Sequence, residues 1–144
     1  MTSNDLNLWR KDATRAYALL RVTLGLNICL HGIVRWFGGL RGFAESLVPM
    51  FQKTPLPSWS VYGFGYSLPI LEAIVGASVL FGFHTRRALI LGAVLMLVLT
   101  FGSSLRQDWP TVGIQLTYSL AYCVLVAGAQ LDDYGLDHIF HRTM

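Results

Sequence analysis

The stretch that decides the fold is TRAYALLRVTLGLNICLHGIVRW, residues 14–36. It holds enough apolar residues to cross a bilayer as one helix at ~1.5 Å per residue, yet Arg21, Asn27 and His31 lie within it. A polar side chain that faces lipid is costly, so these residues are expected to turn toward a protein interior. Arg21, His31 and Arg35 share one helix face at ~100° per residue. Other helices must therefore cover that face.

The composition of the chain indicates that further apolar helices are present. Its 144 residues are 53% hydrophobic and 13% charged, with a mean hydropathy of +0.50, which is too apolar for an ordinary soluble domain. Apolar runs at residues 59–83, 88–105 and 112–129 each approach the ~20 residues that a spanning helix needs. We therefore predict an all-α integral membrane four-helix bundle in the lipid bilayer, formed by residues 1–144 as a single membrane domain.

Residues 37–58 form the one long connection between the expected spans. Phe43, Leu47, Met50 and Phe51 recur there at helical spacing. The pattern predicts a short amphipathic helix that lies on the outer membrane surface as a lid over the bundle.

The basic residues set the expected orientation. Arg10, Lys11 and Arg15 flank the entrance to the first span, and Arg86 and Arg87 lie in the turn between the second and third spans. The positive-inside rule therefore places both termini in the cytoplasm. Because the formal charge is only +3 and the basic residues are dispersed, we expect no nucleic acid partner.

The lower layer of the bundle is expected to be charged. Counted from the inner ends of the spans, Arg21 lies ~10 Å deep, and Glu72 and Tyr118 lie ~15 Å deep. We expect Arg21 and Glu72 to form a buried charge pair, with Tyr118 close enough to donate a hydrogen bond. The pair is either a structural clamp that neutralises two charges in the membrane, or a proton relay or substrate-binding pair.

A neutral polar layer is expected at ~20–25 Å by the same count. Gly32 beside His31 would remove side-chain bulk at this level, so a flat head group such as a quinone could bind there. The expected ligand-binding residues are His31, Asn27, Gln115, Tyr66 and Trp36. Either His31 hydrogen-bonds a quinone carbonyl, or it is a structural residue bonded to Gln115, Ser103 or a backbone carbonyl.

Other cofactors are not expected within this chain. A b-type haem needs two histidines at matching depth, and His31 has no intramembrane histidine partner. We find no metal-ligand set, flavin fingerprint, phosphate-binding loop or nucleophile elbow. We expect no haem, flavin or metal, assign no catalytic residue, and do not expect a complete enzyme.

Several short motifs occur in a fixed order along the chain. They are Arg21-x3-Gly25, His31-Gly32-x2-Arg35, Glu72-x3-Gly76, Leu80-x-Gly82, Thr85-Arg86, and a final Gly128 with Leu136-Asp137. In their order and spacing the chain resembles the DoxX family of DoxX/DoxD-like small four-helix membrane proteins over residues 20–128, although that family usually has Lys at the position of Arg35. The resemblance implies a bacterial cytoplasmic (inner) membrane protein with a role beside redox chemistry and the quinone pool.

Two classes of function follow. The first is a small integral membrane subunit of a quinone-linked oxidoreductase system, which binds quinone or docks a redox partner. The second is a non-redox protein, either a structural or accessory subunit of a larger membrane complex or a small-solute permease. Other protein subunits or further copies of the chain are the expected partners in both classes.

Overall fold

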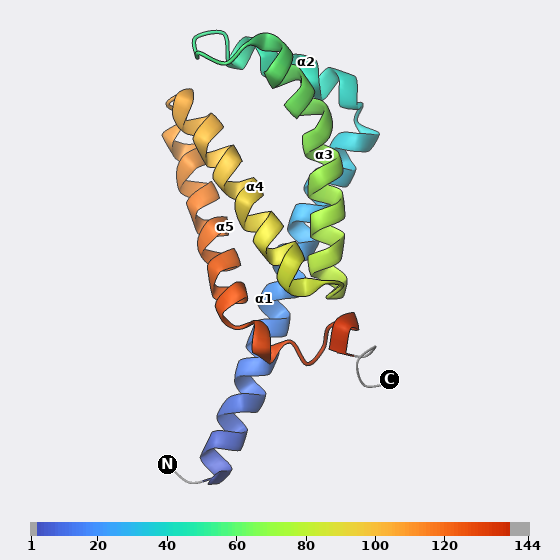
Figure 1. The fold of residues 1–144 in the computed structure, drawn as a ribbon, viewed down its shortest axis with the longest axis vertical. Coiled ribbons are helices and arrows are strands. Elements are labelled where there is room, and N and C mark those ends of the chain that lie inside the picture. The colour runs from blue at the N-terminus through green and yellow to red at the C-terminus, as the bar shows by residue number, and fades with distance from the viewer. Residues whose placement is uncertain (1–2, 139–144) are drawn as a thin grey trace.

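The computed structural model describes residues 3–138 (Figure 1). Within this range α1, α3, α4 and α5 are long and apolar enough to cross a membrane. The predicted all-α membrane bundle is therefore confirmed, and α2 is a short helix in the first long connection. The elements are α1 (Ser3–Phe37), α2 (Leu40–Met50), α3 (Ser58–Phe81), α4 (Thr85–Leu105), α5 (Trp109–Ala127) and the short 3-10 helix η1 (Ala129–Leu131).

Helix α1 begins at Ser3, well before residue 14, where the first span was expected to begin. No proline or glycine interrupts residues 3–24, so nothing in the chain ends the helix at the membrane surface. The side chains of Leu6 and Trp9 are exposed in this extension. Figure 1 shows it projecting beyond the other helices. We call residues 3–15 the projecting part of α1.

The two ends of the bundle differ. One end holds the α3–α4 turn, and the chain enters and leaves the bundle there; we call it the terminal end (Figure 1). The opposite end holds α2 and the α4–α5 turn, and we call it the lid end. The fully buried side chains of the core include Val79, Leu89, Tyr122 and Leu125. These residues lie toward the terminal end of their helices, so the core is densest there.

Helices α1 and α3 pack antiparallel with their backbones close together. A Cβ atom on Gly25 would lie 2.4 Å from the backbone nitrogen of Leu80. One on Gly32 would lie 2.4 Å from the backbone nitrogen of Ala73, and one on Gly76 would lie 2.2 Å from the backbone of α1. Small residues permit this approach in a membrane, where packing rather than water exclusion holds helices together. The glycines therefore fix which residues of α1 lie beside which residues of α3.

Helix α2 lies over α3 and reaches the α4–α5 turn. Ala44 is fully buried, and its Cα lies only 2.8 Å from where a Cβ on Gly65 would stand. From the α4–α5 turn, Arg106 donates a hydrogen bond to Met50 Sδ at 3.2 Å, and its guanidinium lies 5.1 Å from the centre of the Phe51 ring. These contacts join the two helix pairs of the bundle at the lid end.

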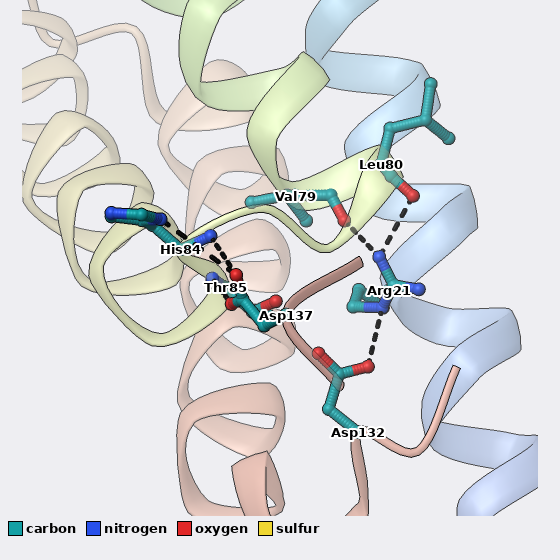
Figure 2. A network of polar contacts seen from close by, with 7 residues as sticks. All are labelled: Arg21, Val79, Leu80, His84, Thr85, Asp132 and Asp137. Carbon is teal, nitrogen blue, oxygen red and sulfur yellow. Dashed lines mark hydrogen bonds and ion pairs between the residues drawn. The ribbon is translucent and has the colours of Figure 1, made fainter. Parts of the chain in front are cut away.

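Arg21 lies at the terminal end, where Figure 2 shows its contacts. Its Nη1 donates to the carbonyl oxygens of Val79 at 2.6 Å and Leu80 at 2.9 Å, and its Nε lies 3.2 Å from Asp132 Oδ1. The last carbonyls of a helix lack partners within the helix and carry the negative end of its dipole. Arg21 therefore caps α3 and ties the segment after η1 to it.

Asp137 supplies the matching cap for α4 (Figure 2). Its carboxylate accepts hydrogen bonds from the backbone nitrogens of His84 and Thr85, both at 2.8 Å. Burial acts to raise the pKa of Asp137, but the N–H groups of Thr85 and His84 outweigh it, so the pKa lies below its ordinary value. The segment at residues 132–137 thus stabilises the terminal end through two carboxylates.

Candidate functional site

A cavity of about 180 Å³ lies among the four membrane helices, and we call it the central cavity. Its lining includes residues near the end of α1 and near the start of α5, so it occupies the half of the bundle nearer the lid end. Each of the four helices contributes to the wall. The lining residues are Ile28, His31, Arg35, Glu72, Met96, Leu99, Thr111, Ile114, Gln115 and Tyr118.

An ion pair forms one wall of the central cavity. Arg35 Nη1 donates to Glu72 Oε2. The Glu72 side chain is only 4% exposed, whereas that of Arg35 is 29% exposed. Phe43 of α2 covers the guanidinium, with its ring centre 4.9 Å from Arg35 Cζ. Helix α2 therefore helps to hold the charge pair in place, and neither charge lies unpaired in low dielectric.

The opposite wall comes from α5 and carries neutral polar groups. Gln115 Nε2 donates to Ser103 Oγ at 3.0 Å, and the Tyr118 hydroxyl donates to Asn27 Oδ1 at 3.0 Å. Gln115 Oε1 is buried and has no hydrogen-bond partner among residues 3–138. A buried acceptor without a partner is costly. The central cavity therefore offers an unused acceptor.

The central cavity opens beside His31. His31 is exposed, and Arg35 Nη2 lies 3.5 Å from its Nδ1. Both residues also line a shallower hollow of about 320 Å³ on the outer face of α1, together with Asn27, Leu30 and Val34. Leu30 and Val34 are exposed apolar residues of a membrane helix. His31 and this hollow therefore lie on an exposed apolar face of a helix long enough to span a membrane.

The expected pair of Arg21 and Glu72 is wrong, because Arg21 pairs with Asp132 and Glu72 pairs with Arg35. The depth count took residue 14 as the inner end of the first span. Instead α1 runs past the end of α3, and the contact between Gly25 and Leu80 places Arg21 at the α3 C-terminus. Tyr118 bonds to Asn27 rather than to either charge.

The expected ligand-binding residues are only partly brought together. His31 and Gln115 line the central cavity, while Asn27 lines the outer hollow. Tyr66 instead packs against Tyr62, with ring centres 5.1 Å apart, and Trp36 is 51% exposed. Neither of these two aromatic residues is among those that line the cavity. The period of a helix gives a residue's face only relative to its own helix, so the sequence could not exclude them.

Two details of the site were not predicted from the sequence. Gly32 gives no space to a ligand, because α3 fills that space: a Cβ there would lie 2.3 Å from the carbonyl oxygen of Pro69. Arg35 is the partner of Glu72. The spacing of Gly25, Gly32 and Gly76 could have predicted this ion pair. An antiparallel pairing through these glycines sets Glu72 beside the turn of α1 that ends at Arg35.

Four apolar helices around a cavity that contains an ion pair define a small multi-pass membrane protein. The family model described as DoxX matches residues 16–104, which is more than half of the chain, and the protein belongs to the DoxX family. The matched range contains Arg21, Arg35 and Glu72, while Gln115 and Tyr118 of α5 lie beyond it. No curated protein and no solved structure matches the chain.

Proposed function

We propose that this DoxX protein is a membrane subunit of a quinone-linked oxidoreductase system and that its central cavity holds the ring of a quinone. The location that goes with this proposal is the bacterial inner membrane, with both termini in the cytoplasm. The observation that carries the proposal is the unpartnered Gln115 Oε1 in a cavity among four helices that are apolar enough to span a membrane. A ligand that enters from the membrane and bears polar oxygens suits such a site.

The size of the central cavity favours a single ring. A cavity of ~150 Å³ in a protein core is enough to take up benzene, and this one measures about 180 Å³. It is smaller than the ~300–1,000 Å³ of pockets that enclose a whole drug-sized ligand. A quinone would therefore place its ring inside, and its isoprenoid tail would leave past Leu30 and Val34 into lipid.

The polar groups complement both redox forms of such a ring. Quinones supply two-electron, two-proton redox chemistry, and they change from carbonyl acceptors to hydroxyl donors on reduction. Arg35 Nη2 makes only a 3.5 Å contact with His31, so it is a donor that a carbonyl would use. Gln115 Oε1 is an acceptor that a hydroxyl would use. His31 also lines the cavity, and an imidazole can both donate and accept a hydrogen bond.

A passage for small solutes through the monomer is less consistent with the packing. Between the central cavity and the terminal end, the interior is filled by fully buried side chains that include Leu89, Tyr122 and Leu125. At the terminal end itself, Arg21 and Asp132 are 3% and 9% exposed. This arrangement favours a site that exchanges its ligand with lipid over a path between the two aqueous sides.

The test is the quinone content of the protein purified in mild detergent. We expect quinone to be retained by the wild-type protein and lost from Gln115→Leu and from His31→Leu. Gln130→Leu is the matched control, because it makes the same change at an exposed glutamine outside α5. All variants should elute as folded protein in size-exclusion chromatography. Wild-type quinone content in both cavity variants, or none in the intact wild-type complex, would contradict the proposal.

A further inference from the structure

A second hollow lies at the terminal end, along the projecting part of α1. Its volume is about 680 Å³, and we call it the terminal groove. One wall is the side of α1 and the other is the turn that follows η1. The lining residues are Asn4, Asn7, Arg10, Lys11, Thr14, Arg15, Asp133 and Tyr134.

The lining of the terminal groove is basic. Arg10, Lys11 and Arg15 face one carboxylate, that of Asp133, so the lining carries a net charge of +2 from three cations and one anion. Arg15 also pairs with the exposed Asp12 at 3.3 Å. Within residues 3–138, Arg10 and Lys11 have no ion-pair partner. Among the described residues, the groove therefore has two cations without a counter-charge.

Asp132 and Asp137, two carboxylates of the segment beside the groove, have other partners. Asp132 pairs with Arg21, and Asp137 accepts from the first backbone N–H groups of α4. Both are thus committed to the packing of the terminal end. The amides of Asn4 and Asn7 add hydrogen-bond donors to the same groove. Cations beside neutral donors are the recognition pattern for phosphate groups.

The position of the terminal groove along α1 relates it to the membrane. Arg21 marks the end of α3, and at ~1.5 Å per residue Arg15 lies ~9 Å and Lys11 ~15 Å beyond it. The polar head-group layer extends ~5–8 Å from the hydrocarbon core, and long basic side chains reach back toward it. Leu19, one turn from Arg15 toward the membrane, is 70% exposed. An acyl chain could lie against it.

We propose that the terminal groove binds the head group of an anionic phospholipid. Its volume lies within the range of ligand sites, and its charge complements a lipid phosphate. The end of the groove at Arg15 lies one helical turn from the exposed Leu19. Basic residues next to a membrane span attract anionic lipids. A free phosphate would use the cations but gain nothing from the apolar surface at Leu19. The proposal does not depend on the central cavity or on a quinone.

The probe is phosphatidylglycerol, compared with phosphatidylcholine, added to protein purified in a zwitterionic detergent. The readouts are the retained lipid in native mass spectrometry and the shift in melting temperature. We expect wild-type protein to bind phosphatidylglycerol, and Arg10→Gln with Lys11→Gln to bind it at least ~10-fold more weakly. The exchange Arg10→Lys with Lys11→Arg should restore binding, because it keeps both charges.

Arg86→Gln with Arg87→Gln is the matched control, since both arginines are exposed in the first turn of α4 and do not line the groove. This control should keep wild-type affinity. An equal loss in the control would overturn the site in favour of general attraction to a basic surface. Equal stabilisation by inorganic phosphate would overturn the lipid as the ligand. All substituted residues are exposed, so the variants should fold, and size-exclusion chromatography checks this.

Discussion

The ion pair of Arg35 and Glu72 gives the sharpest test of the site. Arg35→Met leaves the Glu72 carboxylate, 4% exposed, without a counter-charge. Removing one member of a buried pair costs ~3–5 kcal/mol, because the other charge stays buried and uncompensated. Glu72→Gln leaves Arg35, which is 29% exposed and can turn toward the opening. We expect this second change to cost less, ~1–3 kcal/mol.

The double variant Arg35→Met with Glu72→Gln removes both charges. It should be more stable than the sum of the two single changes predicts, by more than ~1 kcal/mol, because neither charge remains unpaired. The assay is unfolding in mixed micelles of mild and denaturing detergent, followed by circular dichroism. The free energy of unfolding is compared across the four proteins of the cycle.

A second cycle supplies the control. Arg21 and Glu72 are not partners, since Arg21 contacts Asp132 and the end of α3. The costs of Arg21→Met and Glu72→Gln should therefore add to within ~0.5 kcal/mol. Coupling between Arg21 and Glu72 that equals or exceeds the coupling between Arg35 and Glu72 would refute the assignment of the pairs.

Three further predictions concern the packing of α1 on α3, the cap of α4 and the orientation in the membrane. Gly76→Leu should abolish folded protein, because a Cβ there would lie 2.2 Å from the backbone of α1, whereas Gly63→Leu, with nothing within 4 Å, should express normally. Because the pKa of Asp137 is lowered, its carboxylate stabilises the fold above its ordinary pKa of 3.8, and this contribution is lost as the pH falls through the lower folded value. Asp137→Asn should therefore lower the melting temperature at neutral pH and weaken its fall in acid. In a cysteine-free background, an impermeant maleimide added outside should label a cysteine at Lys53 but not one at Arg10; the reverse would overturn the orientation.

The sequence was sufficient for the helices but not for their register. Apolar runs identified all four spans, since length and hydropathy are local properties. The extension of α1 to Ser3 was missed, because polar residues outside a membrane carry no hydropathy signal even where they are helical. Pro55 and Pro57 precede α3, which begins at Ser58, so that boundary is a local property as well.

For the polar residues of the site too, the sequence predicted their general location but not their partners. Glu72, His31 and Gln115 line the central cavity, as expected of polar groups that avoid lipid. Their partners required the relative heights of the helices, and a shift of two turns in α1 was enough to mispair Arg21. Tyr66 and Trp36 do not line the central cavity, because a residue's position along its own helix does not say which side of that helix faces a cavity.

Two of the arginines of helix α1, Arg21 and Arg35, differ in how freely they can change partners. Arg21 and Arg35 are 14 residues apart in the sequence, which is ~21 Å along the helix. Arg21 is 3% exposed, donates hydrogen bonds to two carbonyls and forms an ion pair with Asp132, so any exchange of partners would leave several buried groups unpaired. Arg35 has one firm partner, a long contact with His31 and access to the opening. A ligand in the central cavity can therefore change the contacts of Arg35 while the terminal end, held by Arg21, keeps its structure.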